Sequence, residues 1–247
     1  MYCYQAARTL AIKGAVRSWC YLATRNLGGG LLCPFVRRQV WRTPGAVEPT
    51  GAAVLVANHI SHFDPLLLAL AFDRVIDWMT TEEFYANRLV APWLRAVNTF
   101  PVDRSRPDRR ALRLGLERLR AGRIVGVFPE GGLRAGITSI LGGAAPKSGA
   151  TALARLAGAP IIPCVVLGAD RLYAWRSWWP GPPRVQVWVT IGTPLLVSGL
   201  DSDESNTRLA GVLRELCAAA VAYFDLSPDD LPASPARRKG RDAQAPG

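Results

Sequence analysis

Short apolar runs alternate with amphipathic stretches along most of this 247-residue chain, and this alternation restricts the folds that it can adopt. The runs are rich in Val, Ile and Leu, as are strands buried inside a sheet, and helical periodicity fills the intervals between them. The pattern predicts an α/β domain with a largely parallel central sheet flanked by helices. The predicted strands cover residues 52–57, 75–79, 98–102, 123–128, 160–168 and 184–191. The predicted helices cover residues 65–72, 82–96 (where a break before Pro92 is an alternative), 107–121, 147–157 and 204–224.

Three segments differ in composition and give the predicted domain organisation. Residues 43–226 hold the α/β domain, which is long enough for a large buried core. Residues 1–42 contain seven basic side chains and no acidic one, with aromatic and aliphatic residues between the charges. Residues 227–247 are rich in Pro, Asp and Ala and include a basic cluster, which predicts a disordered basic tail.

The composition of residues 1–42 suits a helix that lies in the headgroup region of an anionic bilayer. We therefore predict a basic amphipathic helical segment that contacts membrane lipids. A helix docked on the domain and a transit peptide are the alternatives. No apolar run is long enough to predict a spanning helix. Five scattered cysteines without a CxxC pair favour a reducing compartment, so we expect peripheral or monotopic attachment to the cytoplasmic face of a membrane.

The formal net charge of +11 at pH 7 is also compatible with a nucleic-acid partner. However, no nucleic-acid recognition motif is visible in the sequence. The aromatic residues do not alternate with basic ones, as a platform for stacking bases would require. We expect no nucleic-acid partner.

Both histidines of the chain lie in one segment, Asn58–Pro65, between a predicted strand and a predicted helix. Such turns at the carboxyl edge of an α/β sheet commonly carry the chemistry of the fold. His59, followed five residues later by Asp64, provides a general base and a carboxylate to orient it. Alternatively, Asp64 caps the helix that Pro65 begins, or His59, His62 and Asp64 bind a metal. Because the chain has no further histidine, we predict no metal site.

Two other strand ends carry charged residues. Arg104 follows the predicted strand 98–102, where its guanidinium is suited to binding a phosphate. After strand 123–128, Glu130 and Arg134 accompany two glycines, which allow backbone amides to approach an anion. By contrast, Cys164 lies inside an apolar run and is interpreted as core filler rather than as a nucleophile.

Together these segments resemble the glycerolipid acyltransferases, whose best-known members are 1-acylglycerol-3-phosphate acyltransferases. Four family blocks occur in order, and their joint match is specific. The matching segments are Asn58-His59 with Ser61 and Asp64, then Phe100-Pro101-Val102-Asp103-Arg104, then Phe128-Pro129-Glu130-Gly131, and finally Ile161-Ile162-Pro163. Lys147 and Gly149 also match a Lys-x-Gly pair of the family. The third block departs from the usual Thr-Arg-Ser continuation, because Gly132 and Leu133 precede Arg134.

The resemblance implies an O-acyltransferase without a cofactor. It would move a fatty acyl group from acyl-CoA or acyl-carrier protein to a lysophospholipid hydroxyl, with 1-acylglycerol-3-phosphate giving phosphatidic acid as the leading reaction. His59 would act as the base and Asp64 would orient it. The residues expected to bind or shape the substrate site are Asn58, Ser61, Phe100, Arg104, Glu130, Gly131, Arg134, Lys147 and Pro163. Another lysolipid or an amine-linked lipid is an alternative acceptor. A non-catalytic lipid-binding protein is an alternative function.

Overall fold

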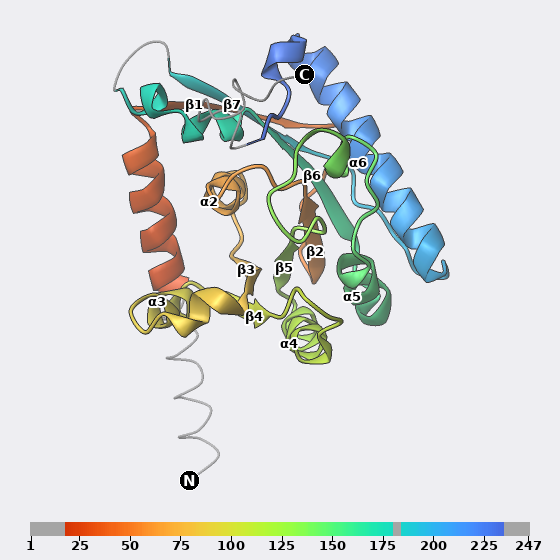
Figure 1. The fold of residues 1–247 in the computed structure, drawn as a ribbon. Coiled ribbons are helices and arrows are strands. Elements are labelled where there is room, and N and C mark those ends of the chain that lie inside the picture. Colours follow the sequence, from red (N-terminus) through yellow and green to blue (C-terminus); the bar gives the residue numbers. More distant parts are fainter. Residues whose placement is uncertain (1–17, 180–183, 235–247) are drawn as a thin grey trace.

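The computed structural model describes residues 18–179 and 184–234, and its centre is a seven-stranded sheet. The strand order is β1-β7-β6-β2-β5-β3-β4 (Figure 1). All neighbouring strands pair in parallel except β6 and β7, so the prediction of a largely parallel sheet is confirmed. The strands are β1 (Val36–Arg42), β2 (Ala53–Ala57), β3 (Ile76–Thr81), β4 (Phe100–Val102), β5 (Ile124–Val127), β6 (Ile161–Leu167) and β7 (Val185–Ile191).

Helices cover both faces of the sheet (Figure 1). One face packs against α2 and the helical residues 18–32, and the other packs against α4, α5 and α6. The α-helices are α2 (Asp64–Ala69), α3 (Val90–Ala96), α4 (Arg109–Arg120), α5 (Gly149–Ala157) and α6 (Ser202–Phe224). The short 3-10 helices are η1 (Glu82–Ala86), η2 (Gly136–Thr138), η3 (Ala169–Tyr173), η4 (Trp175–Trp178) and η5 (Pro228–Asp230).

The central strands are apolar throughout because each of their faces meets a helical layer. In β2, Val54 and Val56 belong to the core on the α4–α6 side. Leu55 and Ala57 alternate with them and belong to the core on the α2 side. All four are fully buried, and the two cores fix the strand in one register.

The prediction that residues 1–42 form a helical segment is wrong for residues 36–42. These residues form β1, which pairs in parallel with β7 at the edge of the sheet. The α/β domain therefore begins before residue 43. Basic side chains are common on edge strands, which is why this strand was difficult to distinguish from a membrane-facing segment.

Three of the arginines expected to face lipid headgroups instead contact carbonyl groups in the last turn of α2 and in the residues that directly follow it. Arg25 donates to the carbonyl of Phe72, Arg38 to that of Leu67 and Arg42 to that of Ala71, at 3.3, 3.5 and 2.9 Å. Carbonyl groups at a helix carboxyl end lack intrahelical partners and attract cations. These arginines therefore help to hold α2 in place. Residues 1–17 lie outside the described part of the chain.

Two further predictions are refined. Of the two alternatives for residues 82–96, the structure has the broken helix: the segment is divided before Pro92 into η1 and α3, and the side chain of Asn87 accepts the backbone NH of Leu89 at the break. The predicted disordered tail begins too early, because residues 227–234 contact the domain. Asp230 pairs with Arg171 at 2.5 Å, and the backbone NH of Ala233 donates to Asp170. The basic cluster at 237–241 lies outside the described residues.

Candidate active site

Four loops meet at the carboxyl edge of the parallel strands, where α/β sheets commonly bind their ligands. They follow β2, β4, β5 and β6, which belong to the parallel part of the sheet. The loops contribute His59, Arg104, Glu130 and Tyr173 respectively. The predicted sequence blocks are therefore brought to one edge by the topology.

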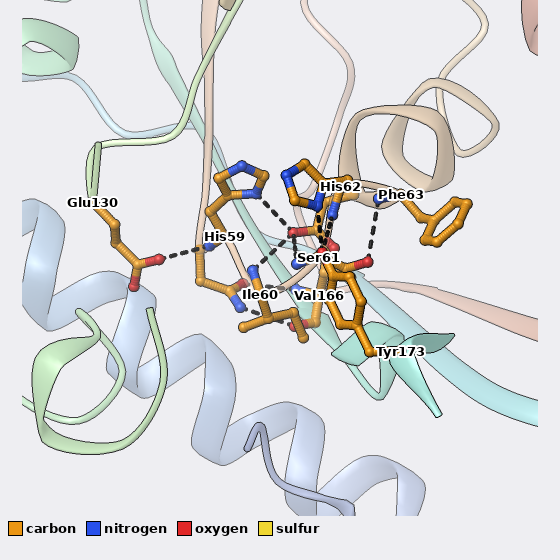
Figure 2. A network of polar contacts seen from close by, with 10 residues as sticks. His59, Ile60, Ser61, His62, Phe63, Glu130, Val166 and Tyr173 are labelled. Atoms are coloured by element: carbon orange, nitrogen blue, oxygen red, sulfur yellow. Dashed lines mark hydrogen bonds and ion pairs between the residues drawn. The ribbon is translucent and has the colours of Figure 1, made fainter. Parts of the chain in front are cut away.

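His59 and Asp64 form a buried pair. The Nδ1 atom of His59 lies 2.9 Å from Oδ2 of Asp64, and this contact is drawn in Figure 2. The same oxygen accepts the backbone NH groups of Ile60 and Ser61, each at 2.8 Å. Asp64 is inaccessible to solvent, while His59 retains 8% exposure. A carboxylate on Nδ1 orients the ring so that Nε2 can accept a proton.

The capping interpretation of Asp64 is wrong. Phe63 occupies the N-cap position of α2 and no side chain caps the helix, while the Asp64 carboxylate bonds to the preceding loop. Complete burial raises the pKa of Asp64, and its bonds with His59, Ser61 and Ile60 oppose this shift by stabilising the carboxylate. Asp64 is therefore placed to orient His59.

The loop after β5 holds the backbone of His59 on two sides. Oε2 of Glu130 accepts the NH of His59 at 2.7 Å, and the backbone NH of Arg134 donates to the His59 carbonyl at 2.9 Å. The other carboxylate oxygen of Glu130 accepts the NH of Ile140 at 2.8 Å. We expected Glu130 to shape the acceptor site, but its carboxylate binds two backbone amides. Burial raises its pKa to about 7, against the lowering effect of these amides.

An aromatic stack that sequence reasoning missed supports the imidazole. The His59 ring stacks on Phe128 with centroids 4.1 Å apart, and Phe128 stacks on Trp78 at 5.0 Å. Gly126 makes room for this arrangement, because a Cβ atom there would lie 2.4 Å from the Trp78 ring. Phe128 is the first residue of the third sequence block, so the sequence contained a signal for it. No local feature of the sequence indicated Trp78.

Tyr173 was also missed. Its hydroxyl accepts the backbone NH of His62 at 3.1 Å and contacts Nδ1 of the His62 ring (Figure 2). It reaches the His59 loop from η3, more than 100 residues later in the chain. Only the fold brings these residues together, so the local sequence offered no signal.

A cavity of about 520 Å³ lies beside this stack, and Phe128 forms part of its wall. Arg104, Gly131 and Lys147, three of the predicted substrate-binding residues, also line it. The Nζ atom of Lys147 donates to the Arg104 carbonyl at 3.2 Å and its backbone NH donates to the Pro129 carbonyl at 2.8 Å, so Lys147 links the loops after β4 and β5 to the start of α5. Partial burial lowers the pKa of Arg104, and nearby Glu83 opposes this shift. The cavity also has apolar walls, formed by Met79, Val102, Val127, Ala111, Leu112 and Leu153.

Four predicted substrate-binding residues are structural instead. Asn58 is fully buried, and its amide group exchanges two hydrogen bonds with the backbone of Val166 at 2.9 and 2.8 Å. Ser61 is buried, and its hydroxyl accepts the backbone NH of Phe63. Phe100 and Pro163 are enclosed in the sheet. Their place in the family blocks suggested contact with substrate. Because their side chains are buried, they stabilise the loops instead.

Arg134 contributes its backbone to the site, while its side chain is exposed and absent from the cavity wall. Cys164 is fully buried, and burial raises the pKa of its thiol, in agreement with its interpretation as core filler. Within residues 18–179 and 184–234, no group of three or more His, Cys, Asp or Glu side chains is arranged to hold a metal ion.

Known proteins are similar to this chain in sequence and in fold. The sequence model of the family described as Acyltransferase matches residues 40–167, just over half of the chain. A Bacillus subtilis (strain 168) protein named 1-acyl-sn-glycerol-3-phosphate acyltransferase is 28% identical over 116 residues, which cover 47% of this chain and 55% of that protein. A Streptococcus pneumoniae protein of the same name is 27% identical over 149 residues, covering 60% and 51%. The chain thus spans about half the length of the curated relatives it matches.

The solved structure of the 1-acyl-sn-glycerophosphate acyltransferase from Thermotoga maritima has the same fold. It aligns with a TM-score of 0.61 over 91% of this chain and 90% of that chain, at 19% sequence identity. This likeness concerns the fold alone. The family match covers the His59 segment, the Arg104 segment, the Glu130 loop and β6, so the resemblance predicted from the four blocks is confirmed: the chain belongs to the acyltransferase family.

Proposed function

We propose that this protein is an O-acyltransferase that transfers a fatty acyl group from an acyl thioester to the free hydroxyl of 1-acylglycerol-3-phosphate. The observation that carries the proposal is the buried His59–Asp64 pair, whose imidazole stacks on Phe128 in the wall of a cavity with both basic and apolar sides. The names of the two curated relatives support the choice of acceptor. The product would be phosphatidic acid.

His59 acts as the general base in the proposed reaction. Its Nε2 atom removes the hydroxyl proton as the acceptor oxygen attacks the thioester carbonyl, while Asp64 holds Nδ1 and stabilises the imidazolium. The carbon–sulfur bond then breaks, and the imidazolium returns the proton to the departing thiolate. The acyl group moves directly to the acceptor, so no nucleophile from the protein is required.

The acceptor phosphate is proposed to bind at the basic part of the cavity wall. Arg104 and Lys147 lie there, and their donors suit a phosphate monoester. Asp103, on the same wall, bonds to Arg106 at 2.7 Å, which neutralises part of its charge. The apolar walls are suited to an acyl chain. Arg134, with its exposed side chain, is a less direct candidate for the phosphate.

The proposed donor is acyl-CoA or acyl-carrier protein, and the chemistry requires no cofactor besides the thioester. The proposed location is the cytoplasmic face of a membrane, with peripheral or monotopic attachment, since a lysolipid with a long acyl chain resides in the bilayer. The basic and aromatic composition of residues 1–17 supports this location. None of the described helices is long and apolar enough to cross a membrane.

A panel of purified lysolipids, each tested with acyl-CoA and with acyl-carrier protein, examines this function. We expect product from 1-acylglycerol-3-phosphate and a loss of turnover by about 10²–10⁴-fold in His59→Ala. Asp64→Asn should act in the same direction, because the ring loses its oriented tautomer. Thermal unfolding of each variant controls for misfolding. Retention of more than about a tenth of wild-type activity by folded His59→Ala would exclude the general-base role.

A further inference from the structure

We propose that three tryptophans near η4 form a second contact with the lipid surface, separate from residues 1–17. This tryptophan cluster consists of Trp175, Trp178 and Trp179, whose exposed fractions are 79, 41 and 77%. Exposed apolar side chains gathered in this way indicate a binding surface. Tryptophan in particular favours the boundary between lipid chains and water, because its ring is apolar and its NH is polar. The inference rests on the proposed function only in requiring a substrate that resides in a bilayer.

Trp178 fixes the cluster to the domain. Its ring contacts Phe35 and Phe63, with centroids 5.4 and 5.5 Å away, and its indole NH donates to the Leu172 carbonyl at 3.0 Å. Ser177 adds a bond from its hydroxyl to the Arg171 carbonyl at 2.6 Å. Trp175 and Trp179 are therefore held outward by a folded element, which keeps the conformational entropy lost on binding small.

The charges that flank the cluster in the sequence match an anionic lipid surface. The chain has no acidic residue between Asp170 and Asp201. Arg176 and Arg184 are exposed, and the Arg176 guanidinium lies 5.5 Å from the Trp175 ring centroid. Arginine beside tryptophan is typical of segments that bind in the headgroup region. This charge distribution favours anionic lipid over an uncharged apolar partner.

The helix of residues 18–32 leads to the cluster through Phe35 and has apolar residues of its own. The inner face of this helix is close to α2, because Cβ atoms at Gly28 and Gly29 would meet Leu66 and Leu70 at 2.9 and 2.7 Å. The helix also exposes large apolar side chains. These are Trp19, Leu27 and Leu31, exposed by 74, 69 and 74%. Phe35, just beyond the helix, contacts Trp178, and Figure 1 shows the red helix leading toward this part of the fold.

The position of the cluster would bring lipid close to the catalytic pair. Phe63, which contacts Trp178, directly precedes Asp64. Tyr173, which bonds to the His59 loop, lies two residues before Trp175. A bilayer seated on the cluster would thus meet the protein beside the loop that acts on the acceptor hydroxyl.

Vesicle sedimentation with the full-length chain tests this surface. The probe is phosphatidylcholine vesicles with and without phosphatidylglycerol, and the variant is Trp175→Ser combined with Trp179→Ser. Trp178 is kept because its ring contacts Phe35 and Phe63. The matched control is Leu156→Ser on α5, which changes a side chain exposed by 62% away from the cluster. We expect the double variant to bind anionic vesicles roughly tenfold or more weakly than wild type, and the control to bind like wild type.

Equal vesicle binding by the double variant and wild type would overturn the proposal. A lipid-free dimer of the wild type that the double variant abolishes would also overturn it, by assigning the cluster to a contact between copies of the chain. Activity is measured separately, with a short-chain acceptor dispersed as monomers. Absence of turnover in the wild type would contradict the proposed function while leaving the vesicle result intact, so the two failures are distinguishable.

Discussion

The Tyr173 hydroxyl contacts both the backbone NH and the ring of His62, so η3 supports the same loop that carries His59. The Glu130 carboxylate supports the same loop by accepting the backbone NH of His59. The His59 segment, which follows β2, is thus held by the segments that follow β5 and β6. Its geometry depends on residues that do not themselves contact the reacting atoms.

Replacing Tyr173 by Phe removes these bonds and retains most of the ring packing. We expect turnover to fall by about tenfold or less while the acceptor KM changes little, because the base is displaced rather than removed. Tyr85→Phe is the matched control, since Tyr85 bonds to Thr99 away from the His59 loop. Steady-state kinetics measure both variants. Unchanged turnover in folded Tyr173→Phe would show that Tyr173 does not position the loop.

Arg104→Ala tests the proposed phosphate contact. Loss of a charged donor from the cavity should raise the apparent KM for 1-acylglycerol-3-phosphate by roughly 10–100-fold and leave the donor KM nearly unchanged. Arg113→Ala, on the exposed face of α4 and outside the cavity wall, removes the same charge as a control. Equal increases in the KM of both substrates would indicate a structural role for Arg104.

Glu130 should make stability depend on pH. Its pKa is about 7 in the fold against an ordinary value of 4.5, so between these values the folded state binds more protons than the unfolded state. The contribution of Glu130 to the unfolding free energy therefore falls as pH rises from 4.5 to about 7, by up to about 3 kcal/mol, and is constant above that range. Urea unfolding at several pH values should show this slope reduced in Glu130→Gln.

The exposed carboxylate of Glu117 supplies the control for that experiment. Glu117→Gln should retain the wild-type slope. Turnover in Glu130→Gln should also fall, because an amide side chain has a single acceptor oxygen and can bind only one of the two backbone NH groups. An unaltered slope together with wild-type turnover would contradict the assignment of Glu130 as the backbone anchor.

Two truncations separate membrane attachment from folding. Deleting residues 1–17 leaves every described element intact and should weaken vesicle binding, because basic and aromatic residues are removed. Deleting residues 1–42 also removes β1 and the helix beside α2, which exposes the edge of β7 and apolar side chains of α2. We expect the longer deletion to lower the melting temperature or cause aggregation in thermal scans. A longer deletion as stable as the full chain would show that β1 is dispensable.

The fold was largely predictable because its central strands are buried on both faces and therefore leave continuous apolar runs in the sequence. β1 was missed because an edge strand with Arg37, Arg38 and Arg42 lacks such a run. The blocks located the site correctly at the strand ends. They did not separate residues that line the cavity, such as Arg104, from residues that fix loops, such as Asn58, because that difference depends on burial and long-range hydrogen bonds.

The hydrogen bonds between the Glu130 loop and His59 have a consequence for any attempt to change the proposed acceptor preference by design. Residues 129–134 both border the cavity, through Gly131, and hold His59, the proposed base, through Glu130 and the Arg134 backbone. A loop exchanged from another family member would move the base together with the cavity wall. Exchanging residues 129–134 should therefore change both the acceptor selectivity and the turnover. Grafts should succeed most often when the His59 segment is transferred together with residues 129–134.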